Sequence, residues 1–202
     1  MELSREDHEA VSSAIRNAEQ HTCGQIVCVL SHASADYAVV PVLLASVLAL
    51  LSPWPLIHFT SWSVERIFLV QIAVFIVAGL VFSWPPLHIA LVPRSARRAL
   101  AHRTALEQFV VRRIANTKNR CGILIFVSLA ERYARIIADE GIAQKVKQAE
   151  WQAAIDMLTV HMHDGRIAQG FIAAIDRCGT VLTAHAPPDG SPNLLPDRLY
   201  VM

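Results

Sequence analysis

Carboxylates that follow predicted strands are the residues of this chain best suited to chemistry. Asp36 follows one short apolar run, and Asp139 and Glu140 follow another, so we expect a carboxylate cluster at one edge of a sheet. Hard cations such as Ca²⁺ or Mg²⁺ prefer several oxygen ligands, and such a metal would assist phosphomonoester hydrolysis. The alternative is that these are ordinary loop charges, because Asp139 and Glu140 directly precede a predicted helix, where negative charge is favourable.

Histidines, serines and cysteines are weaker candidates. His161 and His163 lie two residues apart on a predicted helix, a rotation of about 200° that points their rings to opposite sides. Ser31 and Ser128 end predicted strands, but the sequence around them lacks the nucleophile-elbow pattern of serine hydrolases. The four cysteines form no Cys-x-x-Cys pair and are predicted to be buried free thiols: Cys23, Cys28, Cys121 and Cys178.

Two strands joined by a tight turn must position Asp139 and Glu140. Residues 122–128 are almost wholly apolar and rich in β-branched side chains, which predicts a strand buried on both faces. Residues 133–138 form a second, shorter strand, and 129–132 between them has hairpin length. Glu131 and Arg132 in that turn are either a partner-binding tip or a solvated turn.

The segment before Asp36 supplies a helix and another strand. Ser4 is a plausible N-cap for a helix that extends to Cys23, and residues 25–31 are a short, continuous apolar run. A strand at 25–31 has no partner nearby in the sequence, so it must pair with 122–128 across everything that lies between.

The excess apolar content of the chain lies between residues 38 and 92. Mean hydropathy is +0.38 and only 17% of residues are charged, against about 25% in typical soluble domains. Residues 38–57 and 67–92 contain no Asp, Glu, Lys or Arg, and each is long enough to cross a hydrocarbon core of about 30 Å. These stretches predict a transmembrane helical hairpin, with tryptophans near the span ends as in interfacial belts. The alternative is a buried helical hairpin of a soluble protein.

Charge fixes the expected orientation and excludes some functions. Arg94, Arg97, Arg98 and Arg103 follow the second span, which predicts that both soluble segments lie on the cytoplasmic side of the membrane. A net charge of +1 gives no indication of a nucleic-acid partner. Ionisable groups within the spans are limited to histidines near their ends, which argues against a transporter or channel.

The remainder of the chain is predicted to be mostly helical. A helix over 94–116 is expected to turn Leu106, Phe109, Val110 and Ile114 inward, and further helices are predicted over 142–163 and 166–184. Pro and Gly near the carboxyl end predict an extended arm outside the core. The expected domain organisation is therefore a first part of one domain at 1–36, the hairpin at 38–92, the second part at 93–186 and the arm at 187–202.

Several stretches together resemble the TPM domain family, and the resemblance is closest to bacterial membrane proteins in which two spans interrupt the domain. They are Leu3-Ser-Arg-Glu-Asp7, Ala18-Glu19, Thr22-Cys-Gly24-Gln-Ile-Val27, Cys121–Arg132, Ile137–Ile142 and Asn193-Leu-Leu-Pro196-Asp197. The resemblance implies a three-layer α/β/α sandwich with a small central sheet.

The family includes a thylakoid acid phosphatase and a receptor-accessory protein, and some members bind calcium through acidic residues beside the sheet. Asp36, Asp139 and Glu140 fall at matching polar positions, although many TPM domains have Gly-Tyr-Gly where this chain has Ala138-Asp139-Glu140-Gly141. We therefore expect a membrane-anchored binding or scaffolding module whose partners are the lipid bilayer and other membrane proteins. The alternative is a metal-assisted, acid-phosphatase-like hydrolase that uses calcium or magnesium.

Overall fold

The computed structural model describes residues 3–34, 39–84, 92–190 and 193–202 of the 202-residue chain. It divides into two compact units, one made of 1–34 together with 99–202 and the other of 35–98. The first unit is therefore assembled from segments on both sides of the apolar block, as the pairing argument from the sequence requires.

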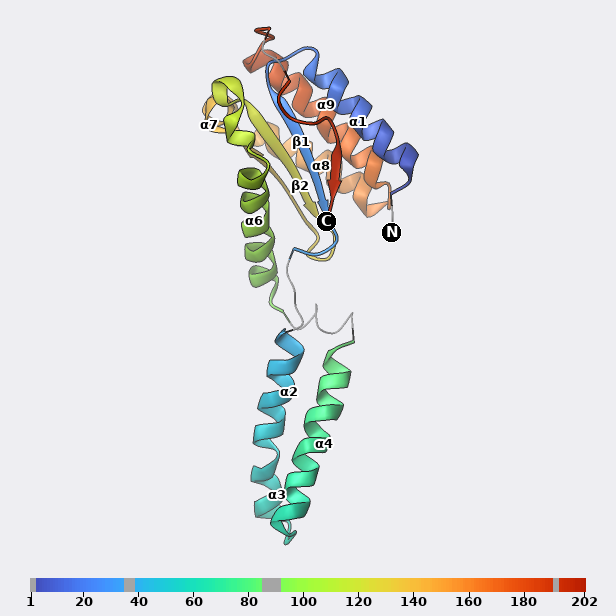
Figure 1. The fold of residues 1–202 in the computed structure, drawn as a ribbon, viewed down its shortest axis with the longest axis vertical. Helices are drawn as coiled ribbons and strands as arrows, with labels where there is room; N and C mark the ends of the chain where they lie inside the picture. The colour runs from blue at the N-terminus through green and yellow to red at the C-terminus, as the bar shows by residue number, and fades with distance from the viewer. Residues whose placement is uncertain (1–2, 35–38, 85–91, 191–192) are drawn as a thin grey trace. The chain divides into compact units, whose positions relative to one another are not determined.

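A four-stranded mixed sheet forms the centre of the first unit (Figure 1). Its strands are β1 (Gln25–Ser31), β2 (Gly122–Ser128), β3 (Tyr133–Ala138) and β4 (Leu199–Val201), in the order β3-β2-β1-β4. β1 is parallel to both β2 and β4, whereas β2 and β3 form the antiparallel hairpin. Gln25 pairs with Gly122 and Ser31 with Ser128, which confirms the predicted pairing of the two apolar runs.

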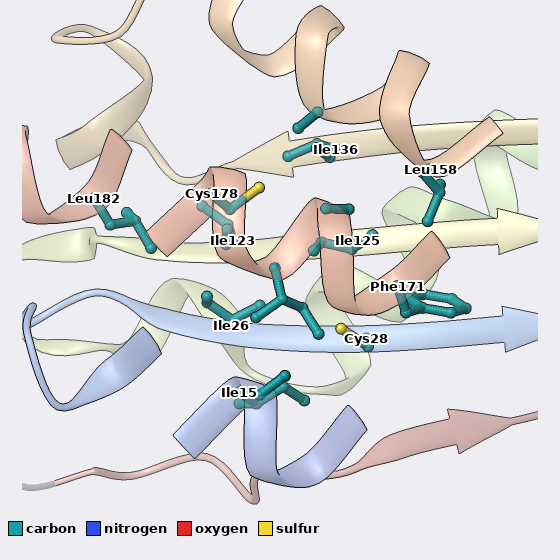
Figure 2. Packing of buried hydrophobic residues seen from close by; sticks show 14 of the residues in the cluster. Ile15, Ile26, Cys28, Ile123, Ile125, Ile136, Leu158, Phe171, Cys178 and Leu182 are labelled. Carbon is teal, nitrogen blue, oxygen red and sulfur yellow. The ribbon is translucent and has the colours of Figure 1, made fainter. Parts of the chain in front are cut away.

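Helices cover both faces of the sheet and give the predicted three-layer α/β/α sandwich. One face packs against α1 (Arg5–Glu19), α8 (Gln148–His163) and α9 (Ile167–His185), and the other against α6 (Arg94–Val111). Alternate residues of β1 and β2 enter the two layers, so both strands are buried along their whole length. Figure 2 shows the larger core, in which aliphatic side chains of the strands meet Ile15, Leu158, Phe171 and Leu182 from the helices.

Local sequence signals explain where α1 begins and how closely it packs. Ser4 accepts a hydrogen bond from Asp7 N, and the Asp7 carboxylate accepts one in return from Ser4 N, so the predicted N-cap is a complete capping box. Gly179 of α9 lies against α1, because a Cβ built there would be 2.9 Å from the Cβ of Ala18. The glycine lets the two helices approach each other.

The face that α6 presents to the sheet differs in part from the one predicted. Leu106 and Val110 are 45% and 72% exposed, whereas Ala101 and Ala105 are fully buried. Phe109 and Ile114 pack inward as expected. The small alanines allow the helix to lie close to the sheet, and close approach outweighs the burial of the larger side chains. The helix ends at Val111, and Ile114–Asn116 continues as a single 3₁₀ turn.

The carboxyl-terminal arm contributes to the sheet, which is a correction to its predicted place outside the core. Leu199, Tyr200 and Val201 form β4 beside Cys28, Val29 and Leu30 of β1. Leu199 is 5% exposed and belongs to the main core. Three strand-forming residues after a Pro-rich segment are too few to give a strand signal in the sequence.

The second unit consists of apolar helices: α2 (Val39–Leu51), α3 (Pro53–Phe59) and α4 (Val64–Phe82). The side chains buried in this unit are mostly small, with Ala45 and Ala49 of α2 and Ala78 of α4 among them. The second predicted span, 67–92, is a helix from Val64 to Phe82, and 85–91 lie outside the described residues.

Candidate functional site

Asp139 and Glu140 lie where β3 ends and the short helix α7 (Glu140–Ala143) begins. Asp139 is the N-cap of α7 and accepts a hydrogen bond from Glu140 N at 2.7 Å. Its carboxylate is 4% exposed and pairs with Arg120, with 3.1 Å between Asp139 Oδ1 and Arg120 Nη2. The more exposed Glu140 carboxylate pairs with Nη1 of the same guanidinium.

Asp139 and Glu140 were predicted to be metal ligands. In the structure their carboxylates are paired with the guanidinium of Arg120 instead. Asp36, the third predicted ligand, lies outside the described residues. In the described part of the chain, no group of three or more His, Cys, Asp or Glu side chains is arranged to hold a metal ion. A calcium or magnesium ion at Asp139 and Glu140 would have to compete with Arg120 for the same oxygens.

A second polar cluster lies at the carboxyl ends of β1 and β2, where Ser31 and Ser128 are register partners. Ser128 Oγ donates a hydrogen bond to Glu131 Oε2. Ser34 donates two more, from Oγ to Ser128 Oγ at 2.8 Å and from its backbone N–H to Glu131 Oε1 at 2.9 Å. These bonds fasten the β2–β3 turn to the loop that leaves β1.

Glu131 was interpreted from the sequence as a solvated turn residue or a partner-binding tip, and its carboxylate is buried instead, with 7% of the residue exposed. Of its two partners, Ser34 is distant in sequence and Ser128 is the last residue of a strand. The Ser-x-x-Glu spacing of 128 and 131 was therefore the only indication of a contact in the sequence. A serine that donates to a carboxylate is oriented rather than activated, because serine nucleophiles usually rely on an adjacent base such as imidazole. The cluster positions a loop and a turn.

A cavity of about 450 Å³ opens beside this cluster, between the β2–β3 hairpin and the end of α8. Apolar side chains make up much of its wall, and Arg132 and His163 add polar nitrogen groups. Its volume falls within the range of small-molecule sites. The residues that line it are Val127, Ser128, Leu129, Arg132, Tyr133, Ala134, Thr159, Met162 and His163.

The two candidate histidines lie at separate places, and the cysteines are free thiols. His161 Nδ1 lies 2.9 Å from Met157 O in its own helix, whereas His163 lines the cavity, so the two imidazoles do not form one ligand pair. All four cysteines are free, and Cys28, Cys121 and Cys178 are buried as predicted, whereas Cys23 is only partly buried. Burial raises the pKa of the Cys28 thiol well above its usual value and that of Cys178 to about 12, which keeps both protonated and unreactive.

Comparison with known proteins identifies the domain to which this site belongs. Residues 85–181 match the family model described as the TPM domain. This segment of the chain is a TPM domain. The matched segment contains α6, the β2–β3 hairpin, α8 and most of α9, and the cavity between β2–β3 and α8 therefore lies within it.

The fold of this TPM domain resembles a solved structure. The NMR structure of the BA42 protein from the psychrophilic bacterium Bizionia argentinensis superposes with a TM-score of 0.63, at 18% sequence identity, over 100% of this chain and 97% of BA42. At that identity the likeness concerns the fold alone. No protein with a curated description matches the chain.

Proposed function

We propose that this protein is a TPM domain anchored in a membrane by its apolar helices, and that it acts as a binding or scaffolding module rather than through a specific reaction. The observation that carries the proposal is the exposure of large apolar side chains along α2, α3 and α4, such as Leu43, Phe68 and Leu80, at 58%, 60% and 72%. Such side chains are stable in hydrocarbon and unfavourable in water.

The lengths of these helices support a membrane-spanning arrangement. Val39–Phe59 and Val64–Phe82 contain 21 and 19 residues, with mean hydropathies of 2.0 and 2.2, and about 20 residues cross a bilayer core. Most large side chains of α2 and α4 are exposed, whereas the buried ones are mostly small. Small residues between helices are typical of packing in lipid, where the hydrophobic effect does not drive helices together.

The strand-end cavity supports the binding role. In open α/β sheets, ligands usually bind beyond the carboxyl ends of parallel strands, and the cavity lies beside Ser128 at the end of β2. The buried Ser128–Glu131 contact holds the turn that carries Arg132 to the cavity wall. A small molecule or a side chain of another membrane protein fits this setting.

The topology we propose has both parts of the TPM domain in the cytoplasm at a bacterial inner membrane. The arginines at the start of α6, Arg94, Arg97 and Arg98, follow the second apolar helix in sequence, and positive residues favour the cytoplasmic side. A reporter that is active only in the periplasm, fused to the carboxyl terminus, should stay inactive, whereas a cytoplasmic reporter should be active.

Membrane extraction tests the anchor, and an enzyme assay tests the binding-module reading. The full-length protein should remain in the membrane pellet after an alkaline carbonate wash and dissolve only in detergent; release by carbonate would contradict the anchor. The protein in detergent should not hydrolyse p-nitrophenyl phosphate, with or without millimolar calcium or magnesium. Hydrolysis lost on Asp139→Asn with Glu140→Gln would instead establish the metal-assisted phosphatase.

A further inference from the structure

Tyr200 of β4 has two guanidinium groups over its ring. The Cζ atom of Arg112, just beyond the end of α6, lies 3.4 Å from the ring centroid, and that of Arg198 lies 4.6 Å from it. Arg112 and Tyr200 belong to the face of the sheet that α6 covers, away from the cavity that α8 borders. Tyr200 thus holds two arginines from distant parts of the chain at one place.

The two positive charges at Tyr200 repel each other, and no carboxylate of the described residues forms an ion pair with either. Asp197, next to Arg198 in sequence, is engaged elsewhere, with Arg16 at 3.6 Å and with Asn193 at 2.6 Å. Burial lowers the pKa of Arg112; Tyr200 counteracts this, and the charge of Arg198 lowers the pKa further. The ring attracts each cation, but it does not neutralise them.

Arg112 also has an unused hydrogen-bond donor. Its Nε atom is buried and has no hydrogen-bond partner in the described structure, although buried polar groups are nearly always paired. A guanidinium presents its N–H groups in a planar fork that matches the oxygens of a phosphate. The site therefore has donors and positive charge in excess of what the protein itself uses.

We propose that Arg112 and Arg198, held by Tyr200, bind a phosphate group. A dianionic oxyanion removes the repulsion between the two guanidiniums and accepts hydrogen bonds from both. This site is separate from the strand-end cavity and goes beyond the binding role proposed for it. The phosphate can belong to a soluble phosphate compound or to the headgroup of an anionic lipid, and both present the same chemistry to the arginines.

Thermal unfolding of the full-length protein in detergent tests the site with inorganic phosphate, at an ionic strength held constant with NaCl. At ten times the dissociation constant, phosphate should raise Tm by about 3–5 °C. Arg198→Gln should weaken phosphate binding at least ten-fold. Arg198→Lys keeps the charge but loses the planar set of N–H donors, so its affinity for phosphate should lie between those of wild type and Arg198→Gln. Arg5→Gln is the matched control, because it removes one positive charge from a 93% exposed side chain on α1.

A second arm uses the protein in phosphatidylcholine nanodiscs with or without phosphatidic acid. If Tm rises only with phosphatidic acid, and the rise depends on Arg198, the ligand is a lipid headgroup. If an Arg198-dependent rise in Tm appears with inorganic phosphate, the ligand is a soluble phosphate. The proposal is overturned if neither arm raises Tm, or if wild type, Arg5→Gln and Arg198→Gln respond equally in both. Each variant's Tm without phosphate shows that it is folded.

Discussion

Glu19, at the end of α1, and Asp197, just before β4, bring two carboxyl groups together from opposite ends of the chain. The Asn193 amide bridges them, donating to Glu19 Oε2 at 2.7 Å and to Asp197 Oδ1 at 2.6 Å, while Glu19 Oε1 accepts from Ile26 N at 2.7 Å. Burial, and secondarily Asp197, raises the pKa of Glu19 to about 8, despite the opposing hydrogen bonds. The Glu19 carboxyl is therefore protonated at neutral pH and links the start of β1 to the arm.

Stability should fall as pH rises through this transition. Glu19 binds its proton more tightly in the folded state than in the unfolded state, where its pKa is near 4.5, so the stabilisation is complete below pH 4.5 and is lost as pH approaches 8. Glu19→Gln keeps a neutral group of the same shape. We expect wild type to lose on the order of 3 kcal/mol between pH 5 and 8 through this group, and the variant to lose much less, as measured by Tm against pH.

The matched control for Glu19 is Glu9→Gln, on an exposed turn of the same helix, where Glu9 pairs with Arg5. Its Tm should follow wild type across the whole pH range. Curves for Glu19→Gln and wild type that stay parallel from pH 5 to 9 would show that the Glu19 carboxyl does not titrate in this window.

Glu131→Ala should destabilise the TPM domain by about 2–3 kcal/mol, because it leaves the Ser34 N–H and the Ser128 hydroxyl without their acceptor in a buried setting. Glu131→Gln retains one acceptor oxygen and should cost less. Denaturant unfolding measures both. Glu140→Ala is the control, because its carboxylate is 59% exposed, and it should change the free energy of unfolding by under 1 kcal/mol. Equal losses of stability for Glu131→Ala and Glu140→Ala would show that burial of the Glu131 carboxylate does not make its hydrogen bonds more stabilising.

Gly141→Ala should be among the most damaging single substitutions, costing more than about 2 kcal/mol. A Cβ at this position would lie 2.0 Å from Asn119 O and 2.8 Å from Arg120 O, so the start of α7 could not stay against the preceding turn. Gly79→Ala is the control, because a Cβ there meets no atom within 4 Å. A Tm for Gly141→Ala within 1 °C of wild type would mean that α7 can move away without cost.

Ala45→Leu should separate α2 from α4, since Ala45 is fully buried in the apolar unit and a larger side chain does not fit a close helix contact. Faster proteolysis of the loop 60–63 in detergent would report the separation. Val47→Leu, at a position 44% exposed on the same helix, should behave as wild type. Indistinguishable cleavage rates for the two variants would place the helix contact elsewhere.

The sequence predicted those features that depend on neighbouring residues or on one continuous apolar run. The N-cap at Ser4, the strands at 25–31 and 122–128 and the membrane-length helices are of this kind. The contact of Glu19 with Asp197 joins residues at opposite ends of the chain, and no local pattern marks it. The inward face of α6 was mispredicted in part, because its larger apolar residues and its alanines lie on different sides of the helix. Which side faces the sheet depends on how closely the helix packs, and the sequence pattern does not show this.

The same limit applies to the candidate sites. Asp139 and Glu140 were placed correctly at the end of β3, but Arg120, which pairs with both, is nineteen and twenty residues earlier in the chain. The arginine pair at Tyr200 joins the end of α6 to β4 and depends on a strand that the sequence did not reveal. Pairings of this sort arise from topology rather than from spacing.

The central position of β1 has a consequence for synthesis. It lies between β2 and β4, which begin 97 and 174 residues after its own first residue. At the 5–20 residues per second of translation, about 5–20 s pass before β2 emerges. During that interval the apolar helices α2, α3 and α4 are synthesised while β1 still has two open edges. β4 begins 77 residues after β2 begins, so the second edge of β1 stays open longer than the first.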